Sequence, residues 1–127
     1  MTTESITTDI EATIDAYLAA YGETDPSRRM ALIRQAWAAD GQLVDPPIEG
    51  AGHDGLDAMF ATVQGQFPGH TFRRSTAVDS HHGIARYGWQ LVAADGSITL
   101  TGMDVAELDE SGTLQRVAGF FGELSPV

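Results

Sequence analysis

Hydrophobic residues recur at three- and four-residue steps through the first half of the chain, a spacing typical of amphipathic helices. The pattern predicts a first helix over residues 5–21 and a second that starts at Asp25-Pro26, with an acidic cap and proline at its first position. A third helix ends before Pro68-Gly69, and Asp54 and Asp57 have the spacing of a capping box at its start. The predicted buried stripes are Ile6, Ile10, Ile14, Tyr17, Leu18 and Tyr21; Met30, Ile33, Ala36 and Trp37; and Leu56, Met59, Phe60, Val63 and Phe67.

The second half of the chain has the pattern of strands separated by turns. A short strand over residues 43–45 is stopped by Pro46-Pro47. Helices followed by an antiparallel meander predict an α+β fold with the helices packed on one face of the sheet. No linker, repeat or low-complexity tract divides the chain, so we expect one domain over residues 1–127. The extended runs cover residues 71–79, 84–93, 97–108 and 113–122.

Asp104 lies on an otherwise apolar face of the strand predicted over residues 98–108. Alternate side chains of a strand point to opposite faces, and the face that carries Asp104 also carries Ile98, Leu100, Gly102, Ala106 and Leu108. A carboxyl group there either has strong hydrogen-bond partners or stays protonated. Enzymes use such groups as general acids, general bases or hydrogen-bond donors. The alternative is a buried aspartate that holds a neighbouring loop in place.

Charge and composition narrow the possible functions. The formal net charge is −11, and such a surface repels phosphate backbones and anionic lipid, so we expect neither nucleic acid nor membrane as a partner. The chain contains no Cys, Lys or Asn, which excludes thiolate and lysine Schiff-base chemistry. The remaining groups are Asp, Glu, His, Tyr and Arg, and this set favours proton transfer over covalent catalysis.

The start of the chain carries no recognisable targeting segment. Residues 1–13 are polar and acidic, without the basic and apolar regions of a signal peptide, and no stretch is long enough to span a bilayer. We therefore expect a cytoplasmic location. We expect no metal, because the sequence has no metal-binding motif. A literal G-x-G-x-x-G at Gly50, Gly52 and Gly55 lacks the βαβ context of a dinucleotide site, so we also expect no cofactor there.

Six segments resemble the nuclear-transport-factor-2-like (NTF2-like) superfamily, which includes the SnoaL-like polyketide cyclases and the ketosteroid isomerases. The resemblance covers nearly the whole chain and implies a cystatin-like cone, in which a curved antiparallel sheet wraps around three N-terminal helices. It also implies a pocket at the mouth of the cone and a homodimer through the outer sheet face. The segments are AYLAAYGETD (16–25), LVDP (43–46), GHDGLDAMF (52–60), DSHHGIARYGWQL (79–91), GMDVAEL (102–108) and GFFGE (119–123).

Three positions match ketosteroid isomerase more closely. By that resemblance Asp45, followed by proline, is the catalytic base, and Tyr17 and Asp104 donate hydrogen bonds to the developing oxyanion. Tyr21, one helical turn after Tyr17, is a competing candidate. Structural roles also remain open, because Asp45 can cap a turn and Tyr17 can fill the core.

An apolar wall is needed to keep a donor aspartate protonated, and Phe60, Tyr87, Trp89 and Phe121 are the candidates to supply it. The SnoaL-like cyclases are expected to pair the aspartate with a histidine. His53, just before the third helix, is the best histidine candidate, although a plain surface position at a helix start is the simpler explanation.

Three functions follow. The first is an isomerase or cyclase that acts by acid–base proton transfer on a hydrophobic carbonyl compound, such as a steroid or polyketide, without a cofactor. The second is a non-catalytic domain that binds a small apolar molecule. The third is an interaction domain whose cone is filled by its own side chains.

Overall fold

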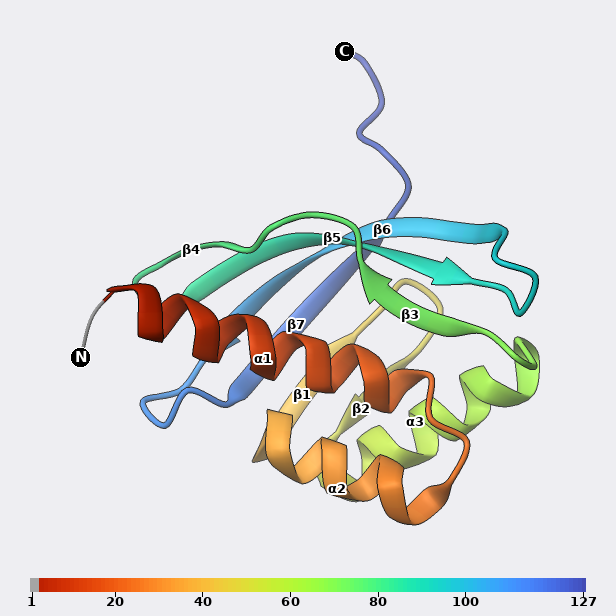
Figure 1. Ribbon diagram of the computed structural model, residues 1–127, viewed down its shortest axis with the longest axis horizontal. Coiled ribbons are helices and arrows are strands. Elements are labelled where there is room, and N and C mark those ends of the chain that lie inside the picture. Colours follow the sequence, from red (N-terminus) through yellow and green to blue (C-terminus); the bar gives the residue numbers. More distant parts are fainter. Residues whose placement is uncertain (1–2) are drawn as a thin grey trace.

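The computed structural model describes the backbone of residues 3–127 and the side chains of residues 9–127. Three helices come first, interrupted by two strands, and five strands complete the chain (Figure 1). The elements are α1 (Thr3–Tyr21), α2 (Pro26–Ala36), β1 (Trp37–Val44), β2 (Glu49–Ala51), α3 (Gly52–Gln66), β3 (Thr71–Arg74), β4 (Asp79–His81), β5 (Ile84–Val92), β6 (Ile98–Leu108) and β7 (Leu114–Phe121).

The helices form largely as their hydrophobic spacing predicts. Asp25 caps α2 by accepting a hydrogen bond from the Arg28 backbone N–H at 2.9 Å, and Pro26 occupies the first helical position. Trp37, predicted in the buried stripe of this helix, instead begins β1.

The capping box predicted for α3 was wrong. The helix begins at Gly52, and its cap residue, Ala51, makes no side-chain hydrogen bond. Asp57 instead accepts a 2.7 Å hydrogen bond from the buried guanidinium of Arg29, which holds α2 against α3. A buried charge needs such a partner, and this need outweighs local capping.

The sheet is curved, mixed and open, with strand order β2-β1-β7-β6-β5-β3 and with β4 pairing the other end of β5. The predicted β5–β6–β7 meander is confirmed. β1, however, runs parallel to β7, so the sheet is not purely antiparallel. The strand predicted over residues 71–79 is two short strands, β3 and β4, and β2 was not predicted.

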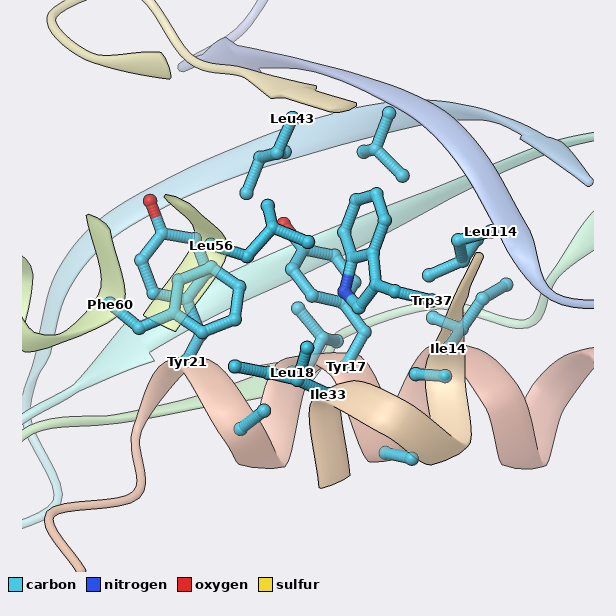
Figure 2. Close-up of a cluster of buried hydrophobic side chains, with 14 of the residues drawn as sticks. Ile14, Tyr17, Leu18, Tyr21, Ile33, Trp37, Leu43, Leu56, Phe60 and Leu114 are labelled. Carbon is cyan, nitrogen blue, oxygen red and sulfur yellow. The ribbon is translucent and has the colours of Figure 1, made fainter. Parts of the chain in front are cut away.

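The helices cover one face of this sheet, and α1 crosses its concave side (Figure 1). Figure 2 shows Tyr17 and Tyr21 rising from α1 toward the sheet, among buried side chains from α2, α3 and β1. Tyr87 and Trp89 of β5 also face inward and are 3% exposed, as the alternation along that strand predicts. The core therefore lies between the concave face and the helices, and the site described below is set into it.

Candidate active site in the concave face of the sheet

Four residues form a row across four neighbouring strands. The parallel register of β1 and β7 places Asp45, which directly follows β1, beside Gly119. Gly119 pairs with Asp104 of β6, and Asp104 pairs with Tyr87 of β5. Residues paired in this way project on the same face, so two carboxyl groups and a phenol meet on the concave side.

Asp104 is 1% exposed and has a donor for each of its carboxyl oxygens. The Tyr87 hydroxyl donates to Oδ2 at 2.8 Å, and the Trp89 indole N–H donates to Oδ1 at 2.9 Å. Burial raises the pKa of Asp104 from its ordinary value of 3.8 to about 7. The Tyr87 hydrogen bond opposes this rise most, the charge of Asp45 adds to it, and Trp89 and Tyr17 oppose it further. The group is therefore poised between its two protonation states near neutral pH.

Asp45 occupies a more open position, at the turn between β1 and β2. Its Oδ2 accepts a 2.7 Å hydrogen bond from the Tyr21 hydroxyl. The turn itself is closed by two backbone hydrogen bonds between Asp45 and Ile48, so the side chain is not needed as a cap. Burial raises the pKa of Asp45, and the Tyr21 hydrogen bond opposes that rise.

Gly119 allows the two carboxyl groups to approach each other. A Cβ atom at this position would collide with Asp45 Oδ1 and would lie 3.1 Å from Asp104 Oδ1. Both oxygens therefore border the space that any other residue would fill with its side chain. This close approach explains why the charge of Asp45 raises the pKa of Asp104.

Gly102 makes a second close approach possible, on the same face of β6. A Cβ atom there would collide with the Trp89 ring. The indole lies across the strand at Gly102 and so reaches the Asp104 carboxyl. A glycine in a strand interior often marks such an approach.

The hydroxyls of two α1 tyrosines complete the polar part of the site. Burial, and then the charges of Asp104 and Asp45, raise the pKa of Tyr17 far above its ordinary value. Burial and Asp45 raise the pKa of Tyr21 in the same way. Both phenols therefore stay protonated and serve as hydrogen-bond donors.

These groups border a cavity of about 170 Å³. Most of its remaining wall is aliphatic or aromatic, and its outer rim includes Pro47, Gln66 and the partly exposed Phe121. The residues that line the cavity include Tyr17, Tyr21, Asp45, Trp89, Asp104 and Phe121. Chemically, this arrangement offers a half-buried carboxylate, a deeply buried carboxyl group and two neutral phenols around an apolar space.

Comparison with solved structures identifies the family. A candidate isomerase of the SnoaL-like family from Agrobacterium tumefaciens strain C58 is 35% identical, with a TM-score of 0.84, over 91% of this chain and 99% of that one. The chain belongs to the SnoaL-like family. No family model and no curated protein matches it.

More distant structures share the fold. An NTF2-like superfamily protein from Salmonella enterica is 18% identical, with a TM-score of 0.72, over 99% of this chain and 97% of that one. A candidate polyketide cyclase from Sinorhizobium meliloti is 12% identical, with a TM-score of 0.68, over 90% and 98% respectively. The NTF2-like α+β cone expected from the sequence is thereby confirmed.

Five of the predicted site residues of this SnoaL-like protein line the cavity. Tyr17, Asp45 and Asp104, the predicted catalytic set, converge there, and Trp89 and Phe121 lie beside them.

Three of the residues predicted to bind substrate lie elsewhere. Phe60 is fully buried behind Tyr21, with ring centroids 4.3 Å apart. Tyr87 lies behind Asp104 and acts on its carboxyl group. His53 Nε2 forms a 2.9 Å hydrogen bond with the Trp37 backbone carbonyl, because His53 lies at the start of α3 and its side chain points toward the start of β1.

Sequence reasoning missed other contributors to the site. Tyr21 was only a competitor to Tyr17, yet both line the cavity because residues four apart share a helix face. Phe72 of β3 also lines it, as alternation with the exposed Arg73 could have indicated. Gly102 and Gly119 had a weaker signal, namely glycine at an inward position of a strand.

The part of the chain that the structure describes also gives information on metal sites and membrane-spanning helices. Its side chains include no group of three or more His, Asp or Glu placed to hold a metal ion. None of its helices has the length and apolar character needed to cross a membrane.

Proposed function

We propose that this SnoaL-like protein is an isomerase or cyclase that moves a proton within an apolar carbonyl compound. The observation that supports this most is the pair Asp45 and Asp104, which flank Gly119 at one apolar cavity. Pairs of carboxyl groups whose environments separate their pKa values commonly divide the roles of base and acid.

In the proposed reaction the ionised Asp45 removes a proton from the carbon next to the carbonyl group. The electron pair moves onto the carbonyl oxygen, where Tyr17 and protonated Asp104 stabilise the oxyanion by donating hydrogen bonds. Asp45 then returns the proton to another carbon of the same molecule. One proton leaves and one returns, so an isomerisation needs no co-reactant.

Exchange of α-hydrogen for deuterium tests this step without knowledge of the natural substrate. A set of enolisable ketones is incubated in D2O with the protein, and exchange is followed by NMR. We expect the wild type to catalyse exchange and Asp45→Asn to lose it. Asp40→Asn is the matched control, because Asp40 lies on β1, the strand that Asp45 follows, and is an exposed residue that accepts a hydrogen bond from Gln115. Full exchange by Asp45→Asn would exclude Asp45 as the base.

A binding-only role is the second candidate, and the mostly apolar wall of the cavity favours it. It predicts tight binding of a small apolar molecule without exchange, and the same affinity in Asp45→Asn. Titration of both proteins with the same ligand separates the two functions.

We also propose that the outer sheet face pairs with a second copy of the chain. Ile84, Val105 and Phe120 are exposed there by 42%, 36% and 54%. Apolar side chains gathered on one face favour association. Sedimentation equilibrium should show a dimer that Phe120→Glu converts to a monomer, and a monomeric wild type would contradict the proposal.

A further inference from the structure

We propose that the cavity selects uncharged carbonyl compounds with a single ring and rejects both carboxylic acids and fused four-ring molecules. The turnover expected of these compounds rests on the proposed proton-transfer function. The binding selectivity can be tested without any turnover. Three properties of the cavity support it: its charge, its size and the stiffness of its wall.

The charge of the cavity is one-sided. Asp45 and Asp104 both line it, and the described lining includes no Arg or His. A ligand carboxylate placed there would approach at least one ionised carboxyl group in a poorly solvated space, with no cation to offset it. A neutral ketone experiences no such repulsion, and its oxygen can accept a hydrogen bond from the Tyr17 hydroxyl.

The size of the cavity suits one ring. Its volume is about 170 Å³. An apolar protein cavity of about 150 Å³ accommodates benzene, whereas sites for drug-sized ligands measure about 300–1,000 Å³. A fused four-ring molecule would therefore leave most of its rings beyond the rim, where they gain little from burial.

The wall is held too firmly to widen easily. The Tyr21 ring lies between Phe60 and Phe72, with centroid distances of 4.3 and 4.4 Å. The Tyr21 hydroxyl donates a hydrogen bond to Asp45, and the Tyr21 backbone carbonyl accepts a 2.7 Å hydrogen bond from Gln64. Close-packed rings of this kind move only with their neighbours.

The opposite wall is also fixed. Trp89 is bonded to Asp104 and packs edge-on against Phe72 and Phe121, with centroid distances of 5.6 and 5.8 Å. A single ring placed between these walls would contact the aromatic side chains on both sides.

The reaction of 3-cyclohexenone illustrates the class. Asp45 breaks a C–H bond at C2, between the carbonyl group and the alkene, and the electron pair passes to the carbonyl oxygen as a dienolate. Return of the proton to C4 forms the conjugated isomer, 2-cyclohexenone. The product has the same atoms as the substrate, and no oxidant or reductant takes part.

The experiment compares three ligands with the wild-type protein. Binding of cyclohexanone, cyclohexanecarboxylate and the four-ring 5-androstene-3,17-dione is measured from the NMR shift of the Trp89 indole N–H. Turnover of 3-cyclohexenone and of the steroid is followed by the absorbance of the conjugated product. We expect the carboxylate to bind roughly 100-fold more weakly than cyclohexanone. We expect kcat/KM for the steroid to be about tenfold or more below that for cyclohexenone.

The outcomes separate the two proposals. Equal turnover of the steroid would overturn the size limit and leave the proposed function intact. Equal binding of the carboxylate would overturn the charge selection. Selective binding of cyclohexanone without any turnover would support the ligand class and contradict the proposed function. Failure of all three to bind would overturn this inference.

A cavity variant gives an independent test of the size limit. Leu100 lines the cavity and makes none of the polar contacts of the site. Leu100→Ala should enlarge the space and raise the preference for a two-ring ketone over a one-ring ketone by about tenfold. Leu124→Ala is the matched control, because Leu124 is 95% exposed outside this cavity. An unchanged preference in Leu100→Ala would contradict the size limit.

Discussion

Asp45 and Asp104 are the same chemical group in two different regions of one site. Asp104 lies in the middle of β6, is 1% exposed and accepts from both Tyr87 and Trp89. Asp45 follows the end of β1, is partly exposed and accepts from one phenol, Tyr21. Burial raises the pKa of both groups, and it raises that of Asp104 to about 7.

The difference teaches how a fold assigns two roles to one residue type. The strand end leaves Asp45 accessible from the cavity, as a base must be. The sheet interior holds Asp104 protonated over a wider range, as a donor to an oxyanion must be. The predictions below test this division, first in turnover, from the largest expected effect to the smallest, and then in stability.

Exchanging each aspartate for asparagine should affect turnover very unequally. Asp45→Asn removes the proton acceptor, and we expect a loss of about 10²–10⁴-fold in kcat. Asp104→Asn keeps a neutral donor of nearly the same shape, so a loss of about tenfold is expected. Steady-state kinetics with 3-cyclohexenone measures both. Equal losses would show that the two carboxyl groups are not divided into base and donor.

Gly119→Ala should disturb the relation between the two groups. The added methyl group would force Asp45 away from Asp104. A displacement on the order of 1 Å costs about 10²-fold in rate when it affects a reacting group. The pKa of Asp104, followed by carboxyl carbon NMR, should fall because the charge that raises it has moved away.

A glycine in a helix serves as the control for this variant. Gly65→Ala adds the same methyl group to α3, where, apart from the neighbouring residues and backbone of the helix itself, no described atom lies within 4 Å of the new position. It should leave both turnover and the pKa of Asp104 unchanged. An unaltered pKa in Gly119→Ala would contradict the role assigned to Gly119.

The pH dependence of turnover tests the same assignment of Asp45 as base and Asp104 as hydrogen-bond donor. The rate should rise with pH as Asp45 ionises and should fall above about pH 7 as Asp104 loses its proton. Tyr87→Phe removes the hydrogen bond that most strongly lowers the pKa of Asp104, so the falling limb should move to higher pH. The control Arg73→Gln, on an exposed side chain of β3, should leave the profile in place. A falling limb that Tyr87→Phe does not move would assign that limb to another group.

Three polar residues of the site, Tyr17, Tyr21 and Asp104, were predictable from local periodicity, because each lies on a regular element. Alternation along a strand placed Asp104 on the inner face, and helical spacing placed Tyr17 and Tyr21 together. The approach of Asp45 to Asp104 was not predictable in this way. It depends on parallel pairing of β1 with β7, which lie about 70 residues apart in the chain, and alternation carries no information about partners.

The wall of the cavity was predicted less well than its polar groups. Phe60 and Tyr87 are aromatic, as residues of the cavity wall were expected to be, but they lie in the layer behind Tyr21 and Asp104. Which of two stacked aromatic layers meets the cavity depends on packing between elements. His53 shows the same limit, since its bond to the Trp37 carbonyl depends on how α3 meets β1.

The last prediction concerns stability instead of turnover, and it involves Asp104 alone. Its pKa is 3.8 ordinarily and about 7 in the folded protein, so between these values the folded chain keeps a proton that the unfolded chain has lost. The contribution of this group to the free energy of unfolding is therefore complete below about pH 4. It declines until about pH 7, by at most on the order of 4 kcal/mol, and is constant above.

Asp104→Asn removes this dependence while keeping an acceptor for Trp89. Between about pH 4 and pH 7 the wild type should lose stability relative to the variant in urea unfolding. Asp40→Asn, at an exposed position, controls for general effects of charge removal. If wild type and Asp104→Asn instead show parallel stability curves, Asp104 is ionised in the folded protein, and the donor role falls to Tyr17.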